Sequence, residues 1–456
     1  MKTYIIVGII LVALVALLAT NKKLVETLKN IYKIEELRQR ILFTLGLLLI
    51  YRLGSFVTLP GVDHSILQQW TQNFANDGSS LMGLLNIFSG GAFSQASIFA
   101  LGVMPYITAS IIIQLLGIMV PYFRKMQREG ESGRRKMNQW TRFLTIAVLL
   151  LQAPAYLATQ VISSGAVVAN GDFLGITNGQ FIVPAVIILI AGTMFIMWLG
   201  EKITDRGIGN GISLIIMIGI VARLPQSFLQ ELMFQTTGGG SIIMLLVELV
   251  FLALVFMLAI AIVQAVRKIP VQYAKRIVGN KQYGGVRQYI PLKLNAANVM
   301  PIIFAQALMF IPGLIWGGQW LDITSFWYNF TLVVLVIAFT YFYTAIIVNP
   351  QMMADDMKRN GGFIPGVKPG KSTVNYIDNI MTRITLPGSI FLALITILPA
   401  IAMTLGITQG FAYFFGGTSL LIMVGVVLDT LKQIESYLLM RHYDGLMKTG
   451  RIQGRY

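Results

Sequence analysis

The chain has 456 residues, of which 55% are hydrophobic and 12% are charged, so its composition excludes an ordinary soluble globular domain. The absence of cysteine excludes disulfides, thiol chemistry and cysteine metal sites, and the two histidines, His64 and His442, are too far apart in sequence to suggest a metal pair. A net charge of +16, from 35 basic and 19 acidic residues, favours contact with anionic lipids or an acidic partner.

The first apolar segment covers residues 4–19 and is followed by Lys22 and Lys23. This positive flank predicts an extra N-terminal transmembrane helix whose start lies outside the cell. No convincing small-x-small cleavage site follows it, but a cleaved signal and an upstream fusion remain alternatives for residues 1–21.

Residues 22–40 have apolar positions at helical spacing with charged residues between them, which predicts an amphipathic helix on the cytoplasmic surface. A simple interfacial anchor and a partner-binding helix explain this pattern equally well. The apolar positions are Leu24, Leu28, Ile31, Ile34 and Leu37.

Ten further hydrophobic segments predict membrane-spanning helices, because continuous apolar runs of this length suit helices rather than a β-barrel. Five spans form an N-terminal half (41–224) and five a C-terminal half (225–430), followed by a tail (431–456). An odd number of spans per half allows the two halves to be inverted copies. The spans are 41–59, 96–120, 143–162, 181–200, 207–221, 241–265, 295–316, 330–348, 384–405 and 414–428.

The basic residues alternate between the connecting segments. Those on one side of the predicted membrane carry 32 of the 35 Lys and Arg residues. The positive-inside rule therefore places residues 22–40 and the C-terminus in the cytoplasm.

A short apolar stretch, residues 80–88, lies between the first two spans and is followed by Ser89, Gly90 and Gly91. It is too short to cross a bilayer, since a helix rises about 1.5 Å per residue. We expect a re-entrant half-helix, with an outer surface loop as the alternative.

Little reactive chemistry is present. The only charged residues in the spans or at the end of the last one are Arg52, Glu248 and Asp429, whereas the substrate paths of transporters are usually lined with such groups. The Gly-Ile-Gly-Asn-Gly run at 207–211 lacks the preceding strand of a phosphate loop. No nucleophile, base and orienting group occur together, so we expect no enzymatic activity and no cofactor.

Six stretches resemble the SecY family, whose bacterial members form the Sec protein-conducting channel. They occur in the family's order and spacing across residues 22–456, which makes the resemblance specific. The stretches are 86–116, 129–136, 192–216, 273–276, 349–370 and 415–422.

The resemblance implies an all-α polytopic membrane protein with two inverted five-helix halves around an hourglass pore. It implies a ring of aliphatic side chains at the waist, a plug, and a lateral gate between the second–third and seventh–eighth helices. The ring positions fall on Val103, Ile107, Ile212, Ile216, Met300 and Ile422. The plug positions are Asn86, Ile87, Phe88, Ser89, Gly90, Gly91, Ala92, Phe93 and Ser94. Thr108, Gln114 and Asn210 match polar gate positions, with helix-packing hydrogen bonds as the alternative.

The resemblance also implies docking loops for a SecA motor or a ribosome, through its rRNA and exit-site proteins. Lys368 stands where the family commonly has Arg, and Met300 replaces a branched residue, which softens the ring. The docking positions are Arg267, Lys268, Lys275, Arg276 and Lys368.

The function implied is translocation of unfolded polypeptides across a bacterial inner membrane and lateral release of transmembrane segments. The implied partners are SecE-like and SecG-like small subunits, signal peptides and nascent chains. A secondary transporter with inverted repeats is the alternative, because it shares broken helices and a repeated architecture. A membrane scaffold without a pore is a third possibility.

Overall fold

The computed structural model describes residues 34–63, 65–67, 86, 89–167, 178–237, 241–273, 276–278, 281–283, 287–316 and 324–449. The chain divides into two compact units, 1–77 with 84–240 and 426–456, and 78–83 with 241–425. The sequence analysis ended the first half at residue 224, whereas this division follows Gly240. The predicted extra segment, 1–21, and most of the predicted surface helix, 22–40, lie outside the described residues.

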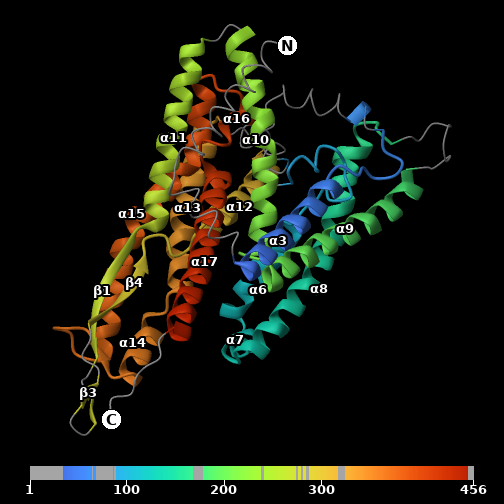
Figure 1. The fold of residues 1–456 in the computed structure, drawn as a ribbon. Helices are drawn as coiled ribbons and strands as arrows, with labels where there is room; N and C mark the ends of the chain where they lie inside the picture. The colour runs from blue at the N-terminus through green and yellow to red at the C-terminus, as the bar shows by residue number, and fades with distance from the viewer. Residues whose placement is uncertain are drawn as a thin grey trace. The chain divides into compact units, whose positions relative to one another are not determined.

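The first unit consists of helices joined by turns (Figure 1). Helix α6 packs against α8, α8 against α9, and α9 against both α3 and α10. The helix α17, Gly417–Thr449, contributes its residues from Val426 onward to this unit. The other helices are α3 Glu35–Gly54, α6 Met104–Met119, α7 Pro121–Arg128, α8 Glu131–Tyr156 with a π-helical continuation Leu157–Ile162, α9 Asn178–Arg206 and α10 Gly211–Thr237.

The second unit combines helices with a small antiparallel sheet (Figure 1). Helix α13 packs against α12 and α15, and α14 packs against α15. The helices are α11 Ile242–Gln264, α12 Met300–Trp316, α13 Phe326–Ile347, α14 Pro350–Arg359, α15 Lys371–Thr404 and α16 Gln409–Ala412. The strands are β1 Val266–Tyr273, β2 Arg276–Val278, β3 Lys281–Tyr283, β4 Arg287–Lys293 and β5 Gly362–Phe363.

The strands are a feature that the sequence analysis did not anticipate. They form a three-stranded sheet in the order β4-β1-β5 and a separate β2-β3 hairpin. Alternate β1 residues, Ile269 and Val271, are buried, while Lys268 and Pro270 are exposed. This period of two is the ordinary consequence of the β-pleat. The fold remains mostly helical, with the strands confined to two connecting segments.

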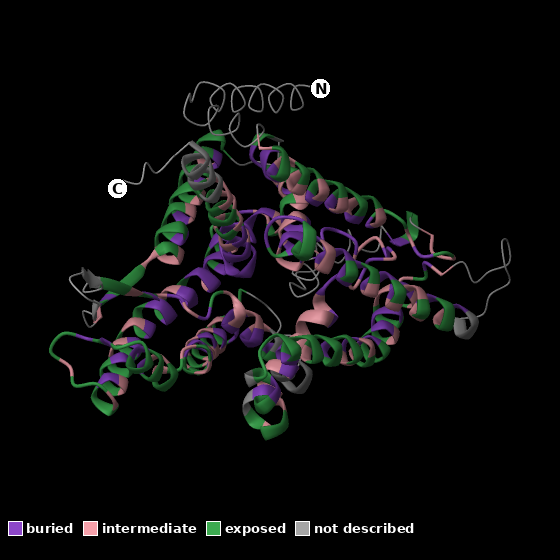
Figure 2. Ribbon diagram, turned by 60° about the horizontal axis from the view of Figure 1, so that its bottom comes forward, coloured by how far each residue is buried: buried purple, intermediate pink, exposed green. Residues whose placement is uncertain are grey.

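The helices expose large apolar side chains along one side and bury others, as the alternating colours of Figure 2 show. Helix α11 exposes Ile243 by 76% and Leu246 by 62% while it buries Leu245 and Glu248. Such exposed apolar surface suits lipid rather than water. Among the described residues, seven helices are long and apolar enough to cross a membrane, or eight if α6 and α7, which meet at 100°, form one bent span.

Several helices begin or end at residues other than those predicted for the spans. Helix α3 begins at Glu35, so the end of the predicted surface helix and the first span form one continuous helix. The predicted span 96–120 is helical only from Met104, because residues 96–103 form turns in which Ala96 and Gly102 have φ of +44° and +54°. Helices α10 and α15 extend well beyond the predicted spans, since polar residues continue a helix outside the hydrocarbon layer.

Candidate functional site

One face of α10 carries two predicted ring residues and also contacts the plug segment, which we define as residues 86–94. Ile212, Ile216 and Gly219 follow one another at spacings of four and three residues, which puts them on the same side of the helix. A Cβ atom added to Gly90 would lie 2.9 Å from the Cα of Gly219. The plug segment therefore lies against the ring-bearing face of α10.

The glycine-rich turn at 207–211 fixes where this face begins. The backbone N–H of Ile208 donates to Thr44 Oγ1 at 3.1 Å. The N–H of Gly209 donates to Gln433 Oε1 at 2.8 Å. Side chains of α3 and α17 thus occupy N–H groups that would otherwise be available to a phosphate. The turn therefore positions the start of α10 against α3 and α17.

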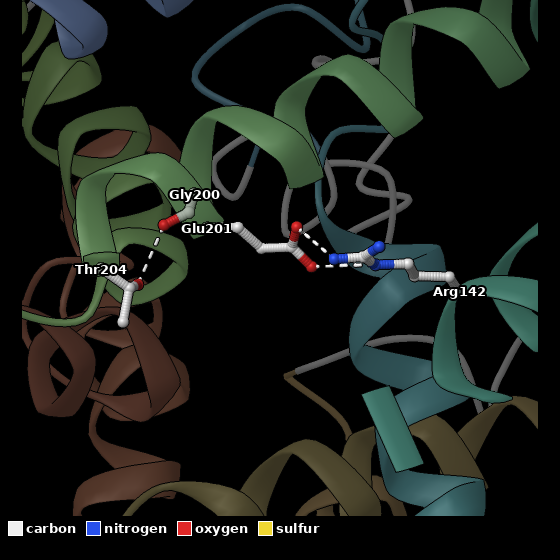
Figure 3. Close-up of polar contacts among 4 residues, drawn as sticks. All are labelled: Arg142, Gly200, Glu201 and Thr204. Atoms are coloured by element: carbon white, nitrogen blue, oxygen red, sulfur yellow. Dashed lines mark hydrogen bonds and ion pairs between the residues drawn. The ribbon is translucent and has the colours of Figure 1, made fainter. Parts of the chain in front are cut away.

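A second set of polar contacts joins α8 to α9, as Figure 3 shows, and α9 to the start of α10. Thr204 Oγ1 donates to the carbonyl oxygen of Gly200 and accepts from the N–H of Gly211, both at 2.9 Å. Arg142 donates to both carboxylate oxygens of Glu201, with N–O distances of 3.1 and 2.6 Å. This two-point geometry fixes the orientation of Arg142, so α8, α9 and the start of α10 are held in register.

The other ring residues of the first unit lie at the start of α6. Val103 is the N-cap residue and is 7% exposed, and its carbonyl oxygen accepts from the N–H of Ile107 at 3.0 Å. Pro105 occupies the first turn, where a proline suits the helix start. Val103 and Ile107 therefore lie one turn apart at the point where the irregular segment becomes a helix.

The second unit contains the remaining two ring residues. Met300 is the first residue of α12 and is partly buried, while Ile422 in α17 is 7% exposed. The ring that would unite all six residues stays a prediction.

The plug segment is a compact turn in its described part, which is Asn86 and 89–94. Gly90 and Gly91 have φ of +64° and +97°, a left-handed conformation that favours glycine. The carbonyl oxygen of Asn86 accepts from the N–H of Gly91 at 2.9 Å, and its side-chain oxygen accepts from the N–H of Ser94 at 3.3 Å. Ile87, Phe88 and the predicted half-helix before Asn86 lie outside the described residues.

The plug segment is also packed against its own unit. Ser89 and Ala92 are 4% and 1% exposed. Tyr156 of α8 donates its hydroxyl to the carbonyl oxygen of Phe93 at 2.7 Å, and the two rings lie 4.8 Å apart. These contacts bury residues 89–94 within the first unit, and the re-entrant half-helix stays a prediction.

The three polar gate residues have local hydrogen-bond partners. Thr108 Oγ1 donates to the backbone carbonyl four residues earlier at 3.1 Å. Gln114 Nε2 donates to Ser110 Oγ at 3.3 Å. Asn210 is exposed, and its side-chain oxygen accepts from the N–H of Ser213 at 3.4 Å. These bonds lie within one helix or at its start, and a role at a lateral gate stays a prediction.

The docking residues lie on the strand-containing part of the second unit. Arg267 and Lys268 are exposed on β1, and Lys368 is exposed in the turn before α15. Arg276 begins β2, and Lys275 lies outside the described residues.

The two basic segments belong to one folded body. Strand β1 pairs with β5, which joins the 266–293 segment to the 349–370 segment. Their shared hydrophobic core includes residues of β1, β4, α14 and α15, which lie together in Figure 1. A force on either segment is therefore transmitted to α15. The buried core residues are Ile269, Val271, Leu292, Met357, Ile364, Ile377 and Met381.

Sequence reasoning missed Arg223, which contacts the plug segment. It ended the fifth span at residue 221, although α10 continues to Thr237 and buries Glu231 and Gln235, whose side chains are hydrogen-bonded at 2.9 Å. The available signal was helical spacing, because Arg223 lies four residues after Gly219 on the ring-bearing face.

Comparison with known proteins gives consistent results. The SecY family profile matches residues 97–431. The protein translocase subunit SecY of Streptomyces scabiei is 44% identical over 443 residues, covering 91% of this chain and 98% of the relative. A solved protein-conducting channel has a TM-score of 0.58 at 18% identity, covering 87% of this chain and 91% of its own. Sec61 in a canine ribosome–channel complex from the endoplasmic reticulum has a TM-score of 0.52 at 16% identity, with the same coverage.

Proposed function

Because this chain belongs to the SecY family of protein translocase subunits, we propose that it forms a pore through which unfolded secretory polypeptides cross a bacterial inner membrane. Transmembrane segments leave the same pore sideways into lipid. The protein acts as a channel rather than as a catalyst, and the energy comes from its partners. The family assignment does not support the secondary transporter that the sequence left open.

The observation that carries this proposal is the plug segment folded against the face of α10 that bears Ile212 and Ile216. A closed pore needs an apolar constriction and a segment that seals it, and two of the predicted ring residues and the predicted plug segment meet at this face. Apolar constrictions exclude water and ions by dewetting, and flexible aliphatic walls can close around a passing chain.

The experiment that tests this function is translocation by the purified translocase in proteoliposomes. A precursor with a signal sequence should become protected from external protease when the SecA motor and ATP are supplied, and a precursor without that sequence should not. Absence of protection together with uptake of a small solute would favour a transporter. Absence of both would favour a scaffold without a pore.

We propose that the strand-containing body of the second unit faces the cytoplasm, together with the C-terminus, because most basic residues lie on that side. Arg267, Lys268, Lys275, Arg276 and Lys368 then present positive charge to an acidic surface of the SecA motor or the ribosome. SecE-like and SecG-like subunits complete the complex, and anionic lipids contact the remaining basic residues.

Lys368→Glu is expected to weaken binding of the SecA motor at low salt, because it reverses an exposed charge on the docking body. We expect a loss of affinity of about three- to tenfold, which shrinks as salt is raised. Arg135→Glu is the matched control, since Arg135 is also exposed but belongs to α8 of the other unit. Binding measured by biolayer interferometry checks this, and equal losses in both variants would assign the effect to net charge alone.

A further inference from the structure

We infer that Arg52 and Arg223 form a two-arginine latch that holds the plug segment in its closed position. This inference rests on the proposed function, because it assumes that the plug segment closes a pore. It assigns the closing force to two side chains outside the plug segment, one from α3 and one from α10.

Arg223 contacts both ends of the described plug segment. Its Nη2 donates to Asn86 Oδ1 at 2.7 Å and to Ser94 Oγ at 3.2 Å. The close fit depends on Gly91, since a Cβ atom there would lie 2.9 Å from the same Nη2 atom. The guanidinium of Arg223 therefore forms hydrogen bonds to both ends of the turn, on the side of the turn that faces α10.

Arg52 contacts the middle of the same turn. Its Nη1 donates to the carbonyl oxygen of Gly90 at 2.8 Å. The guanidinium also lies 4.6 Å from the ring centre of Phe56, a cation–π contact that fixes its direction. Arg52 and Arg223 thus approach the turn from two helices, and all three hydrogen bonds break if the segment moves away.

Neither arginine forms an ion pair within the part of the chain that the structure describes. Both are partly buried, and the shortest hydrogen bonds of each guanidinium go to neutral oxygen atoms of the plug segment, with a longer bond from Arg52 to Ser55 Oγ at 3.5 Å. A desolvated charge is costly unless it is hydrogen-bonded. Displacement of the segment therefore requires water or the carbonyl groups of a passing chain to replace those oxygens.

Because the chain lacks cysteine, Ala92→Cys supplies a single thiol in the plug segment, at a position that is 1% exposed. The proposed experiment measures the rate at which a maleimide labels this thiol in the purified translocase. Arg223→Leu is expected to raise that rate by about tenfold, the factor that loss of a hydrogen bond to a charged group represents. Arg223→Lys should have an intermediate effect, since it keeps one donor without the planar fork.

Two further variants distinguish loss of the latch hydrogen bonds from a general loosening of the packing around α10. Asn86→Ala removes the acceptor from the plug side and should raise labelling as well, with little further increase when it is combined with Arg223→Leu. Ser227→Ala is the control, because Ser227 is a buried polar residue of α10 one turn beyond Arg223. It should leave the labelling rate unchanged.

Ion conductance in planar bilayers distinguishes the latch from the proposed function. Arg223→Leu and deletion of residues 86–94 should both raise the resting conductance. If the deletion raises conductance but Arg223→Leu changes neither conductance nor labelling, the latch is overturned and the plug remains. If labelling rises but neither change affects conductance, the segment does not seal a pore, and the plug role and the latch fail together.

Discussion

Ile107→Asn is expected to raise the resting ion conductance and to allow export of precursors with defective signal sequences. Ile107 belongs to the predicted ring, and an amide in an apolar constriction holds water that the sec-butyl group of isoleucine excludes. Exchange of a hydrocarbon for an amide changes the hydration free energy by about 2 kcal/mol or more. That difference corresponds to more than about tenfold in the balance between a dry and a wet constriction.

Ile422→Asn provides an independent test from the second unit, since Ile422 is also a predicted ring residue and is 7% exposed. Ile107→Leu is the matched control, because it keeps the side chain aliphatic. Planar-bilayer recordings measure the leak, and a signal-defective precursor measures discrimination. Unchanged values in both Asn variants would place Ile107 and Ile422 outside the constriction.

The sequence predicted most of the transmembrane helices, because apolar length and charge asymmetry are strong local signals. It was least accurate where a helix begins or ends at a different residue from the apolar segment. The run 96–120 is apolar over most of its length and has no charged residue, yet its first eight residues form turns beside the plug segment. Hydropathy cannot distinguish buried turns from a helix, since both lie away from water.

The sequence indicates candidate positions for the site, but it does not show which residues far apart in the chain contact them. The resemblance identified the plug segment and the ring positions in order along the chain. It did not identify Arg223 or Tyr156, whose contacts with the plug segment join residues more than sixty positions apart. Such contacts follow from packing, which a single sequence does not show. The sheet β4-β1-β5 was missed because its strands β1 and β4 carry charged residues and β5 has only two residues.

The close approach of α9 and α10 is the feature whose loss should be most damaging to the first unit. A Cβ atom at Gly211 would overlap the carbonyl oxygen of Gly200 and lie 2.7 Å from the Cβ of Ile203. A backbone oxygen cannot rotate away, so the turn itself must move. The bond from the N–H of Gly211 to Thr204 Oγ1 would be lost with it.

Gly211→Ala is therefore expected to destabilise the protein by about 1–3 kcal/mol, the typical cost of overpacking an interior. The same substitution should also raise the ion leak, because Ile212 follows directly and must shift with the turn. Gly46→Ala is the matched control: no atom lies within 4 Å of the added Cβ in α3, so alanine should be neutral or stabilising by up to about 1 kcal/mol. Thermal unfolding of the purified translocase compares the two variants. Equal stability would show that α9 and α10 can separate without cost, and Gly211 would then have no part in positioning the ring-bearing face.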